Sequence, residues 1–228
     1  MEFKIVEIFD SIEGEGKRTG APATFIRLAG CNLRCTYCDT QYALEAVDDE
    51  YKTMQLDELL AYLKKRHYSR VTLTGGEPLS TAGVEVLIHR MLLQGNRVNI
   101  ETNGSIDISF LLEYLQNMQY DPGKELFFTM DYKLPSSGVT NSMHMPNFTK
   151  LRQWDVLKFV VGSDQDVSSM VEIVQTLTSK PQIYIGAVHG KYDLKKLVTI
   201  ILDIPELKDV KLQLQMHKII WNADERGV

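Results

Sequence analysis

The sequence predicts an α/β fold built around a parallel sheet, which is either doubly wound or curled into a barrel. Two observations lead to this prediction. Segments typical of strands alternate with segments of helical periodicity along almost all of the 228 residues, the pattern of a sheet with crossover helices. Polar motifs also follow directly after the predicted strands, where α/β proteins place their sites. The length suits one domain covering residues 1–228.

The predicted elements follow in this order. Strands at residues 3–9 and 23–28 lie on either side of the glycine-rich turn Glu13-Gly14-Glu15-Gly16. Residues 55–67 form the first helix, because four leucines between positions 56 and 63 recur at helical spacing. Next come strand 70–74, helix 83–93, strand 97–101, helix 107–118, and strands 125–130 and 156–161. Ser163 and Asp166 resemble a capping box that opens a helix running to residue 177. Strand 182–187, helix 193–202 and strand 210–215 complete the order.

Five polar motifs come directly after predicted strands. They are the loop of three cysteines, Gly75-Gly76-Glu77-Pro78, Thr102-Asn103-Gly104, Asp131-Tyr132-Lys133 and Gln215-Met216-His217. In a parallel sheet or barrel the carboxyl ends of these strands open onto one face. The sequence therefore predicts a single pocket that is lined from five strand ends.

The cysteines of the chain, Cys31, Cys35 and Cys38, lie close together in the pattern C-x3-C-x2-C. Three thiolates on one loop can hold three corners of an iron–sulfur cube, which usually takes four cysteines. The fourth iron would then stay open, and an open coordination position is typical of a reactive metal site. Structural zinc and unligated thiols are the alternatives. Disulfides are disfavoured by the odd number of cysteines and by the lack of a secretory leader.

Composition limits the classes of partner. The chain is 44% hydrophobic and 24% charged, with a formal net charge of −5, which argues against a broad nucleic-acid surface while permitting a local basic pocket. No apolar run approaches the length of a membrane span. We therefore expect no nucleic acid and no membrane as partners. Clustered, unpaired cysteines without a leader indicate the reducing cytoplasm.

Three motifs carry a resemblance to a known family. The cysteine pattern followed by Gly75-Gly76-Glu77 resembles the radical S-adenosylmethionine superfamily. The runs 11–16, 25–31 and 38–40 resemble, more narrowly, the 7-carboxy-7-deazaguanine synthases. The resemblance covers nearly the whole chain and is most specific in its N-terminal part. One departure is Glu13, where members more often carry glutamine; an ionised carboxylate cannot donate a hydrogen bond.

The resemblance implies a partial, open TIM-like barrel of about six parallel strands with an added N-terminal strand. It also implies a 4Fe-4S cluster with one open iron, S-adenosylmethionine and Mg²⁺. Reductive cleavage of S-adenosylmethionine would give a radical that takes hydrogen from 6-carboxy-5,6,7,8-tetrahydropterin. The ring then contracts and loses ammonia to give 7-carboxy-7-deazaguanine, a precursor of 7-deazapurine (queuosine-type) nucleosides. A one-electron donor such as flavodoxin or ferredoxin, and a homodimer, are implied as partners.

The resemblance also implies roles for individual residues. Cys31, Cys35 and Cys38 would hold the cluster and Thr40 would bind magnesium, which prefers oxygen ligands. Gly75 and Gly76 lack Cβ atoms, so their backbone can approach the ammonium of S-adenosylmethionine. The expected S-adenosylmethionine contacts are Gly75, Gly76, Glu77, Glu101, Asn103, Asp131, Tyr132, Lys133, Gln213 and Gln215. The expected pterin contacts are Ile12, Glu13, Gly14, Glu15, Arg27 and Thr74, with the planar fork of Arg27 matched to the pterin carboxylate.

Two other functions remain open at this point. Another radical S-adenosylmethionine enzyme, such as a glycyl-radical activase, would share the cysteine loop. It would not need Arg27 and the Glu13–Gly16 turn as a small-molecule pocket. A non-catalytic iron–sulfur or zinc module would be favoured by a fourth cysteine, which the chain lacks. Glu77 either contacts the cofactor or orients its loop, and His189 and His217 receive no role.

Overall fold

A computed structural model describes residues 1–45, 50–223 and 225–228. Nine strands in this part of the chain form one sheet in the order β3-β1-β2-β4-β5-β6-β7-β8-β9. Seven of them, β2 and β4 to β9, run parallel, whereas β1 and β3 are antiparallel additions at one edge. The strands are β1 (Glu2–Ile12), β2 (Pro22–Leu28), β3 (Lys52–Gln55), β4 (Arg70–Gly75), β5 (Arg97–Thr102), β6 (Leu126–Tyr132), β7 (Val156–Val161), β8 (Gln182–Ala187) and β9 (Lys211–Leu212).

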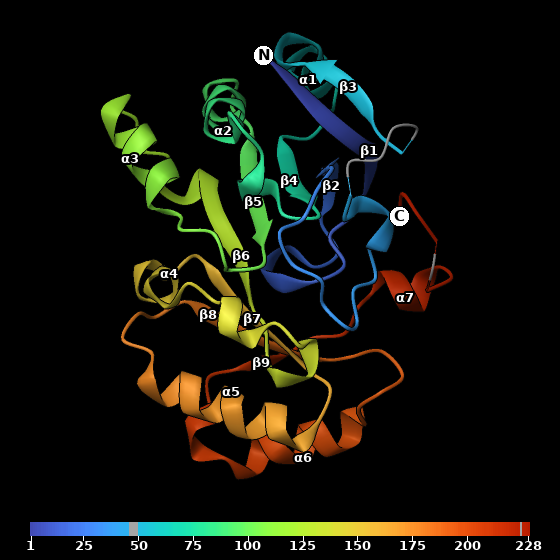
Figure 1. Cartoon of the computed structure of the whole chain (residues 1–228), viewed down its shortest axis with the longest axis vertical. Helices are drawn as coiled ribbons and strands as arrows, with labels where there is room; N and C mark the ends of the chain where they lie inside the picture. The colour runs from blue at the N-terminus through green and yellow to red at the C-terminus, as the bar shows by residue number, and fades with distance from the viewer. Residues whose placement is uncertain (46–49, 224) are drawn as a thin grey trace.

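The sheet is curved and open, because β3 and β9 form its two edges and do not pair with each other (Figure 1). This confirms the predicted partial barrel, with seven parallel strands in place of about six. The helices are α1 (Leu56–Lys64), α2 (Val84–Leu93), α3 (Ser109–Asn117), α4 (Met145–Lys150), α5 (Asp164–Thr176), α6 (Leu194–Asp203) and α7 (His217–Ile220). Within the described residues, none of them combines the length and the apolar character needed to cross a membrane.

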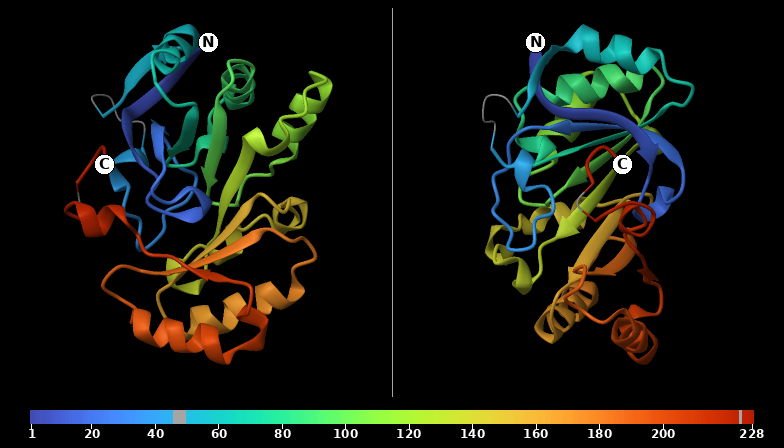
Figure 2. Two further views of the ribbon diagram at one scale, coloured as in Figure 1. Left: turned by 180° about the vertical axis from the view of Figure 1, so that it is seen from behind. Right: turned by 90° about the vertical axis from the view of Figure 1, so that its right-hand side faces the viewer.

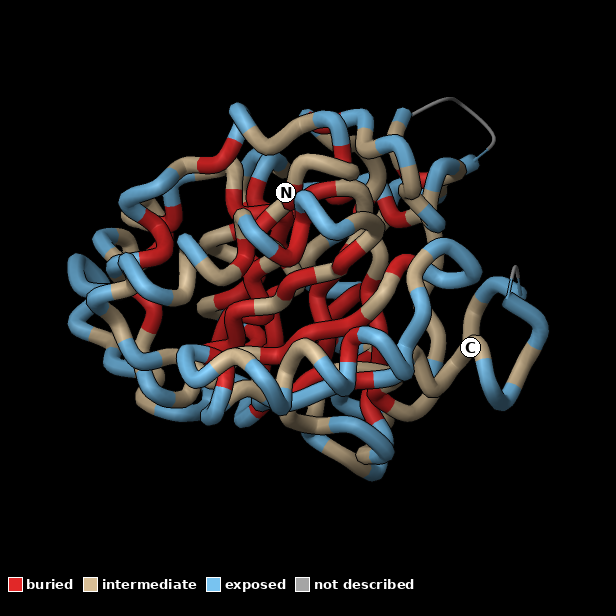
Figure 3. The backbone as a smooth tube through the Cα atoms, turned by 90° about the horizontal axis from the view of Figure 1, so that it is seen from below, coloured by how far each residue is buried: buried red, intermediate tan, exposed pale blue. Residues whose placement is uncertain are grey.

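The hydrophobic core lies between the sheet and the helices that cover its outer side. Ile26, Leu73, Ile100, Phe128 and Phe159 come from five neighbouring strands, and all are at most 1% exposed. Figure 3 shows this buried interior surrounded by exposed helix surfaces. Removing such a side chain from water contributes about 2 kcal/mol to stability, so this core fixes the relative positions of the strand ends.

Three helices and strands are absent from the sequence prediction: β3, α4 and the four-residue helix α7. Strand β3 pairs with β1, and its last residue, Gln55, forms a capping box with Glu58 at the start of α1. The predicted helix 55–67 is therefore shorter, because Gln55 belongs to the strand. Helix α4 has six residues and begins next to Pro146. All three are too short for a periodic pattern to reveal them.

Two predicted strands have different lengths in the structure. Strand β1 extends to Ile12 because it pairs with β2 up to the pair Ile12 and Pro22. Strand β9 is only Lys211–Leu212, not 210–215. Beyond it the chain keeps one bond of the ladder, from Gln213 N to Ile185 O (2.9 Å). The side chain of Gln213 then turns to the glycine-rich turn, where its Oε1 accepts a hydrogen bond from Gly16 N (2.9 Å).

Half of the predicted capping box at α5 is present. The hydroxyl oxygen of Ser163 accepts a hydrogen bond from Asp166 N, as predicted. The carboxylate of Asp166 does not return to Ser163 N. It accepts hydrogen bonds from Gly162 N (2.7 Å) and Ser136 N (2.8 Å) instead. Asp166 thereby ties the loop after β6 to the end of β7.

Candidate functional site

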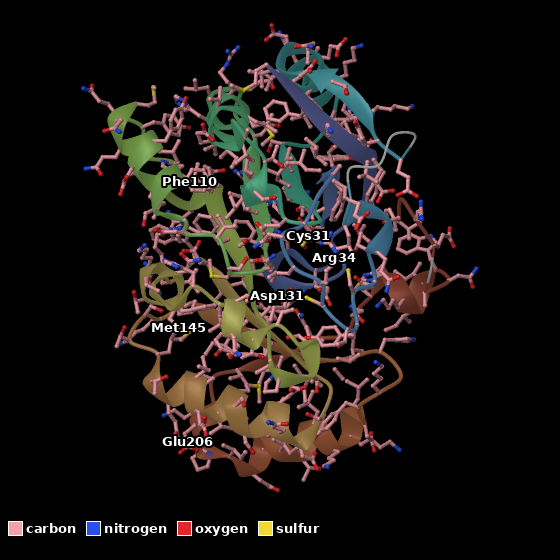
Figure 4. All side chains as sticks on the ribbon, in the orientation of Figure 1. Cys31, Arg34, Phe110, Asp131, Met145 and Glu206 are labelled. Carbon is pink, nitrogen blue, oxygen red and sulfur yellow. The ribbon has the colours of Figure 1, made fainter. Side chains whose placement is uncertain are left out.

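A cavity of about 280 Å³ opens at the carboxyl ends of the parallel strands. All five polar motifs that follow predicted strands contribute to its lining, which confirms that the sequence places them at one pocket. The motif residues that line it are Cys31, Cys35, Cys38, Gly75, Gly76, Thr102, Asn103, Asp131, Lys133, Gln215 and His217. Figure 4 shows Cys31 and Asp131 near the middle of the molecule, where the cysteine loop faces the end of β6.

The cysteine loop is held by backbone hydrogen bonds at its start and again between Cys35 and Cys38. Gly30 N and Cys31 N donate to Ala43 O (2.8 Å) and Leu44 O (3.0 Å), and Thr36 N donates to Ser137 O (3.0 Å). All three cysteines are free thiols that are partly buried at the cavity. Their arrangement suits a cluster in which each thiolate binds a different iron. Among the described residues, no three side chains of the metal-ligating types converge on a single-ion position.

Asn103 connects the end of β5 to the cysteine loop. Its Nδ2 donates to Asn32 Oδ1 (3.0 Å) and lies 3.8 Å from the sulfur of Cys31. The amide is held in this orientation because Ser105 N and Ser105 Oγ both donate to its Oδ1. Hydrogen bonds to cluster sulfurs are one of the features that set reduction potentials, so Asn103 is suited to contact the ligand sphere of a cluster.

Gly75 and Gly76 bring the end of β4 against the cysteine loop. A Cβ atom on Gly75 would lie 2.3 Å from Leu28 O, and one on Gly76 would lie 2.2 Å from Gly30 O and 2.7 Å from the Cβ of Cys31. No side chain fits in either place. Both glycines line the cavity, and the close approach that demands them here is to the protein backbone of β2 and of the loop.

Glu77 is completely buried and is absent from the cavity lining. Its carboxylate accepts hydrogen bonds from Leu79 N (3.0 Å), Thr102 Oγ1 (2.9 Å) and Asn103 N (2.7 Å). Burial raises the pKa of Glu77 to about 7, against these three hydrogen bonds, which lower it. Of the two roles that the sequence left open, the observed contacts are those of a residue that orients the loops after β4 and β5.

Alternating charges line the side of the cavity formed by β6 and β7. Lys158 Nζ lies 2.8 Å from Glu15 Oε2 and 3.5 Å from Asp131 Oδ1, and Lys133 Nζ lies 2.9 Å from Asp131 Oδ2. Burial raises the pKa of Asp131, but the two lysines outweigh it and hold that pKa below its usual range. For Glu101, burial outweighs the nearby Lys158 and raises the pKa of the carboxyl.

Arg27 lies on β2 and lines the same cavity. Its Nε donates to Glu7 Oε1 (2.6 Å), and Tyr42 OH donates to the same oxygen (3.0 Å). Within the described residues, the two η nitrogens of Arg27 donate no hydrogen bond to another side chain. Glu7 therefore fixes the guanidinium while leaving its forked end for a ligand.

Thr40 and Asp39 form the rim of the cavity next to the last cysteine. Thr40 Oγ1 donates to Asp39 Oδ1 (3.1 Å), and Asp39 Oδ2 pairs with Lys218 Nζ (3.0 Å). A hydroxyl beside a carboxylate offers the hard oxygen atoms that Mg²⁺ prefers. The carboxylate of Asp39 faces the ammonium of Lys218, which lies on α7.

The glycine-rich turn is anchored from the C-terminal part of the chain. Met216 N donates to Gly14 O (3.1 Å), and a Cβ on Gly14 would lie 2.6 Å from the ring of His217. Glu13 points away from the cavity: it is 2% exposed and accepts a hydrogen bond from Thr72 Oγ1. Its own N and O are paired with Ala21 and Gly20 across the turn.

Most of the residues predicted from the sequence line this one cavity, and four do not. The four that lie outside its lining are Glu13, Glu77, Tyr132 and Gln213, all of them buried. Residues that the sequence analysis did not assign to the site also line it, among them Tyr37, Tyr42, Thr129, Lys158, His189, Lys218, Ala223, Glu225, Gly227 and Val228. A lone lysine inside the apolar strand Val156–Val161 was the available signal for Lys158.

Comparison with known proteins shows the family of the chain. The model of the radical SAM superfamily matches residues 25–121. The chain is 45% identical to the 7-carboxy-7-deazaguanine synthase of Clostridium acetobutylicum over the full length of both proteins. It is 36% identical to that of Methanospirillum hungatei, over 95% of this chain and 85% of the relative.

Solved structures agree on the fold. The crystal structure of QueE from Escherichia coli superimposes with a TM-score of 0.76 at 22% identity, covering 95% of each chain. Streptococcus suis SuiB bound to its precursor peptide SuiA gives a TM-score of 0.57 over 81% of this chain and 47% of that one. Together with the full-length sequence matches, these findings show that the chain belongs to the 7-carboxy-7-deazaguanine synthase family of the radical SAM superfamily.

Proposed function

We propose that this protein converts 6-carboxy-5,6,7,8-tetrahydropterin to 7-carboxy-7-deazaguanine, with loss of ammonia. The observation that carries the proposal is that one cavity is lined both by the three cysteines and by Arg27. A cluster ligand set and a guanidinium for a carboxylate thus face the same small space. The match to 7-carboxy-7-deazaguanine synthases over the full chain supports the same reaction.

The cysteine loop fits a 4Fe-4S cluster with one open iron, because it offers three thiols at one cavity and the chain has no fourth cysteine. When bound and reduced, the cluster with S-adenosylmethionine supplies a 5′-deoxyadenosyl radical for hydrogen abstraction from the pterin. Burial raises the pKa values of Cys31 and Cys35. Loading of iron therefore has to displace protons from these thiols.

The residues at the ends of β4, β5 and β6 are the proposed S-adenosylmethionine contacts. Gly75 and Gly76 present backbone atoms without side chains, and Asn103, Asp131 and Lys133 add polar groups at the same wall of the cavity. Glu101 and Gln215 line the cavity as well. Glu77, Tyr132 and Gln213 are proposed to act from behind the cavity by holding the contacting loops.

Arg27, the glycine-rich turn and Thr74 form the proposed pterin subsite. Arg27 would bind the pterin carboxylate through its two η nitrogens, since Nε is already held by Glu7. Ile12, Gly14, Glu15 and Thr74 line the same region. Glu13 is proposed to support the turn from behind, because its side chain faces Thr72. Thr40 is the proposed magnesium ligand, beside the carboxylate of Asp39.

The reaction needs one electron, so we propose a small one-electron donor of the flavodoxin or ferredoxin type as partner. We also propose a homodimer and a cytoplasmic location, the compartment in which three free thiols at one cavity persist. A glycyl-radical activase remains the second candidate because it would use the same cysteine loop.

The proposal is tested by anaerobic incubation of iron-loaded protein with the pterin, S-adenosylmethionine, Mg²⁺ and a reductant, followed by mass spectrometry. We expect 7-carboxy-7-deazaguanine and ammonia in equal amounts, and 5′-deoxyadenosine as evidence that S-adenosylmethionine is cleaved. Cleavage of S-adenosylmethionine without conversion of the pterin would favour the activase. The absence of any cleavage would indicate a non-catalytic cluster protein.

Arg27→Ala tests the pterin subsite within this assay. We expect its KM for the pterin to rise at least tenfold, about 1.4 kcal/mol, while slow cleavage of S-adenosylmethionine continues. Arg97→Ala is the matched control, since Arg97 begins β5 at the other end of the sheet and pairs with Glu125 on the surface. An unchanged KM in Arg27→Ala would show that another group binds the carboxylate.

A further inference from the structure

Lys158 is a buried cation in the wall of the cavity, at the middle of β7. Its side chain is 13% exposed, and its ammonium pairs with Glu15 (2.8 Å) and with Asp131 (3.5 Å). Glu15 belongs to the glycine-rich turn after β1, whereas Asp131 lies in β6. One side chain therefore joins two carboxylates that come from distant parts of the chain.

A lone ammonium in such a place would be unstable, because removing a charge from water costs several kcal/mol unless it is paired. Here Glu15 and Asp131 supply the pairing, and the carboxylate of Glu101 adds to the negative field. Burial opposes the charge, but these three carboxylates hold the pKa of Lys158 well above its usual value. The lysine is thus a permanent positive charge at neutral pH.

The two carboxylates that Lys158 joins belong to different proposed subsites. Both carboxylates line the cavity; the proposed function assigns Glu15 to the pterin and Asp131 to S-adenosylmethionine. Asp131 is also held by Lys133 (2.9 Å), so its position depends on two ammonium groups. A ligand that draws Glu15 toward itself changes the charge balance at Lys158, and with it the position and field of Asp131.

We propose that Lys158 is a positioning residue that couples the binding of the pterin to the binding of S-adenosylmethionine through Glu15 and Asp131. The inference rests on the proposed function, since that function assigns the two ligands to the two carboxylates. Coupling between ligands is reciprocal: each ligand preorganises the carboxylate that the other one needs. In turnover, the same link restrains cleavage of S-adenosylmethionine until the pterin is in place.

Three variants separate this role from a structural one. Lys158→Met removes the charge and keeps an unbranched side chain, and Lys158→Arg keeps the charge. The double variant Lys158→Met with Glu15→Gln removes a neutralising pair together, which guards against misfolding from an unpaired buried carboxylate. Lys196→Met is the matched control, because Lys196 pairs with Asp164 on the outer surface.

The measurement is the affinity of iron-loaded, unreduced enzyme for labelled S-adenosylmethionine by equilibrium dialysis, with and without saturating pterin. For wild type and Lys196→Met we expect the pterin to tighten binding by about fivefold or more. For Lys158→Met and the double variant we expect the ratio of the two S-adenosylmethionine affinities, with and without pterin, to fall to about one. Lys158→Arg should restore part of the coupling. The number of S-adenosylmethionine molecules cleaved per product should rise at least threefold in Lys158→Met.

A structural role would lower both affinities and the melting temperature while leaving the coupling ratio unchanged. That result, or a wild-type enzyme without coupling, would overturn the inference. So would loss of coupling in Lys158→Arg to the level of Lys158→Met, since the charge is then not what matters. If wild type fails to convert the pterin at all, the proposed function is wrong; if wild type converts it and Lys158→Met keeps the coupling, only this inference is wrong.

Discussion

The carboxyl group of Glu13 lies behind the cavity, between the glycine-rich turn and β4. Thr72 Oγ1 donates a hydrogen bond to it and Arg18 Nη1 lies 3.9 Å away. Burial, and then the charge of Glu101, raise the pKa of Glu13 to about 7, although Thr72 and Arg18 act in the opposite direction. Glu13 is thus a side chain that supports the turn from behind the cavity.

Glu13→Gln should therefore remove a pH dependence of stability. A carboxyl whose pKa is raised in the folded state stabilises the fold at low pH, and that contribution is lost as the pH rises through the folded pKa. As the pH rises from 5 to 8, the free energy of unfolding of Glu13→Gln should increase relative to that of wild type by on the order of 2 kcal/mol. This corresponds to about 5 °C in melting temperature. Melting of the iron-loaded protein over this pH range is the measurement. Glu125→Gln, at an exposed carboxylate, is the control, and a gap independent of pH for Glu13→Gln would contradict the expectation.

Cys35 is one of three thiols available to a cluster, so its loss should be decisive. In Cys35→Ala two thiolates remain, which hold a cube poorly. We expect iron content, brown colour and activity to disappear together, with the fold retained. Tyr37→Phe keeps all three thiols and should keep its iron. Iron analysis and electron paramagnetic resonance check this, and an active but colourless Cys35→Ala would mean that the cysteine loop serves another purpose.

At the scale of elements, the contact between the end of β4 and the cysteine loop depends on two glycines. Gly76→Ala places a methyl group 2.2 Å from Gly30 O, so either the loop or the strand must move. We expect a loss of about 2 kcal/mol or more in stability, together with poor iron loading. Gly186→Ala, inside β8, is the matched control because its nearest neighbour would be Gln213 at 3.6 Å, an ordinary contact. Melting temperature and iron content distinguish the two, and normal iron loading in Gly76→Ala would show that the loop tolerates the shift.

The sequence predicted the central parallel strands β4 to β7 and their motifs well because most residues of these strands are buried and polar residues follow them. Strand β3 was missed since its four residues at the edge of the sheet are exposed or partly exposed and carry no apolar alternation. Lys158 was missed although it lies within the strand β7, in which buried residues alternate with residues that line the cavity. Leu157, Phe159 and Val161 are fully buried, whereas Lys158 and Val160 line the cavity. The local sequence fixes which side of the strand each residue takes, but the two carboxylates that face Lys158 come from far away in the chain.

Glu77 illustrates a second limit of sequence analysis. A carboxylate directly after a glycine pair suits either a ligand contact or a loop anchor, and the sequence contains no feature that separates them. The direction of the side chain decides, and it depends on the backbone of the next strand, which donates Asn103 N to the carboxylate. The same holds for Glu13, whose direction is set by Thr72 on a neighbouring strand.

At the scale of the whole molecule, the open sheet leaves a gap between β9 and the N-terminal strands, and the C-terminal segment crosses it (Figure 2). The crossing is tied by hydrogen bonds to the glycine-rich turn, from Gly16 N to Gln213 and from Met216 N to Gly14 O. Lys218 then pairs with Asp39 on the cysteine loop. The last part of the chain thereby completes the cavity that the parallel strands begin.

The final residues close the mouth of this cavity on the Arg27 side. Glu225, Gly227 and Val228 line it, and the guanidinium of Arg226 stacks on the ring of Tyr42 with 3.7 Å to its centroid. Deletion of residues 225–228 removes this wall but none of the bonds from Gln213, Met216 and Lys218. We therefore expect an unchanged fold and iron content, with the KM for the pterin raised about tenfold, equal to about 1.4 kcal/mol.

Arg226→Ala separates the stacking contact from the rest of the wall in that deletion. A cation stacked on an aromatic ring contributes about 0.5–1 kcal/mol at an exposed site, so this variant should raise the KM by about threefold, less than the deletion. Steady-state kinetics with the pterin varied at saturating S-adenosylmethionine gives both values, with iron content as the check on folding. If the deletion leaves the KM unchanged, the pterin binds without help from the C-terminal residues, and the mouth of the cavity is open in the working enzyme.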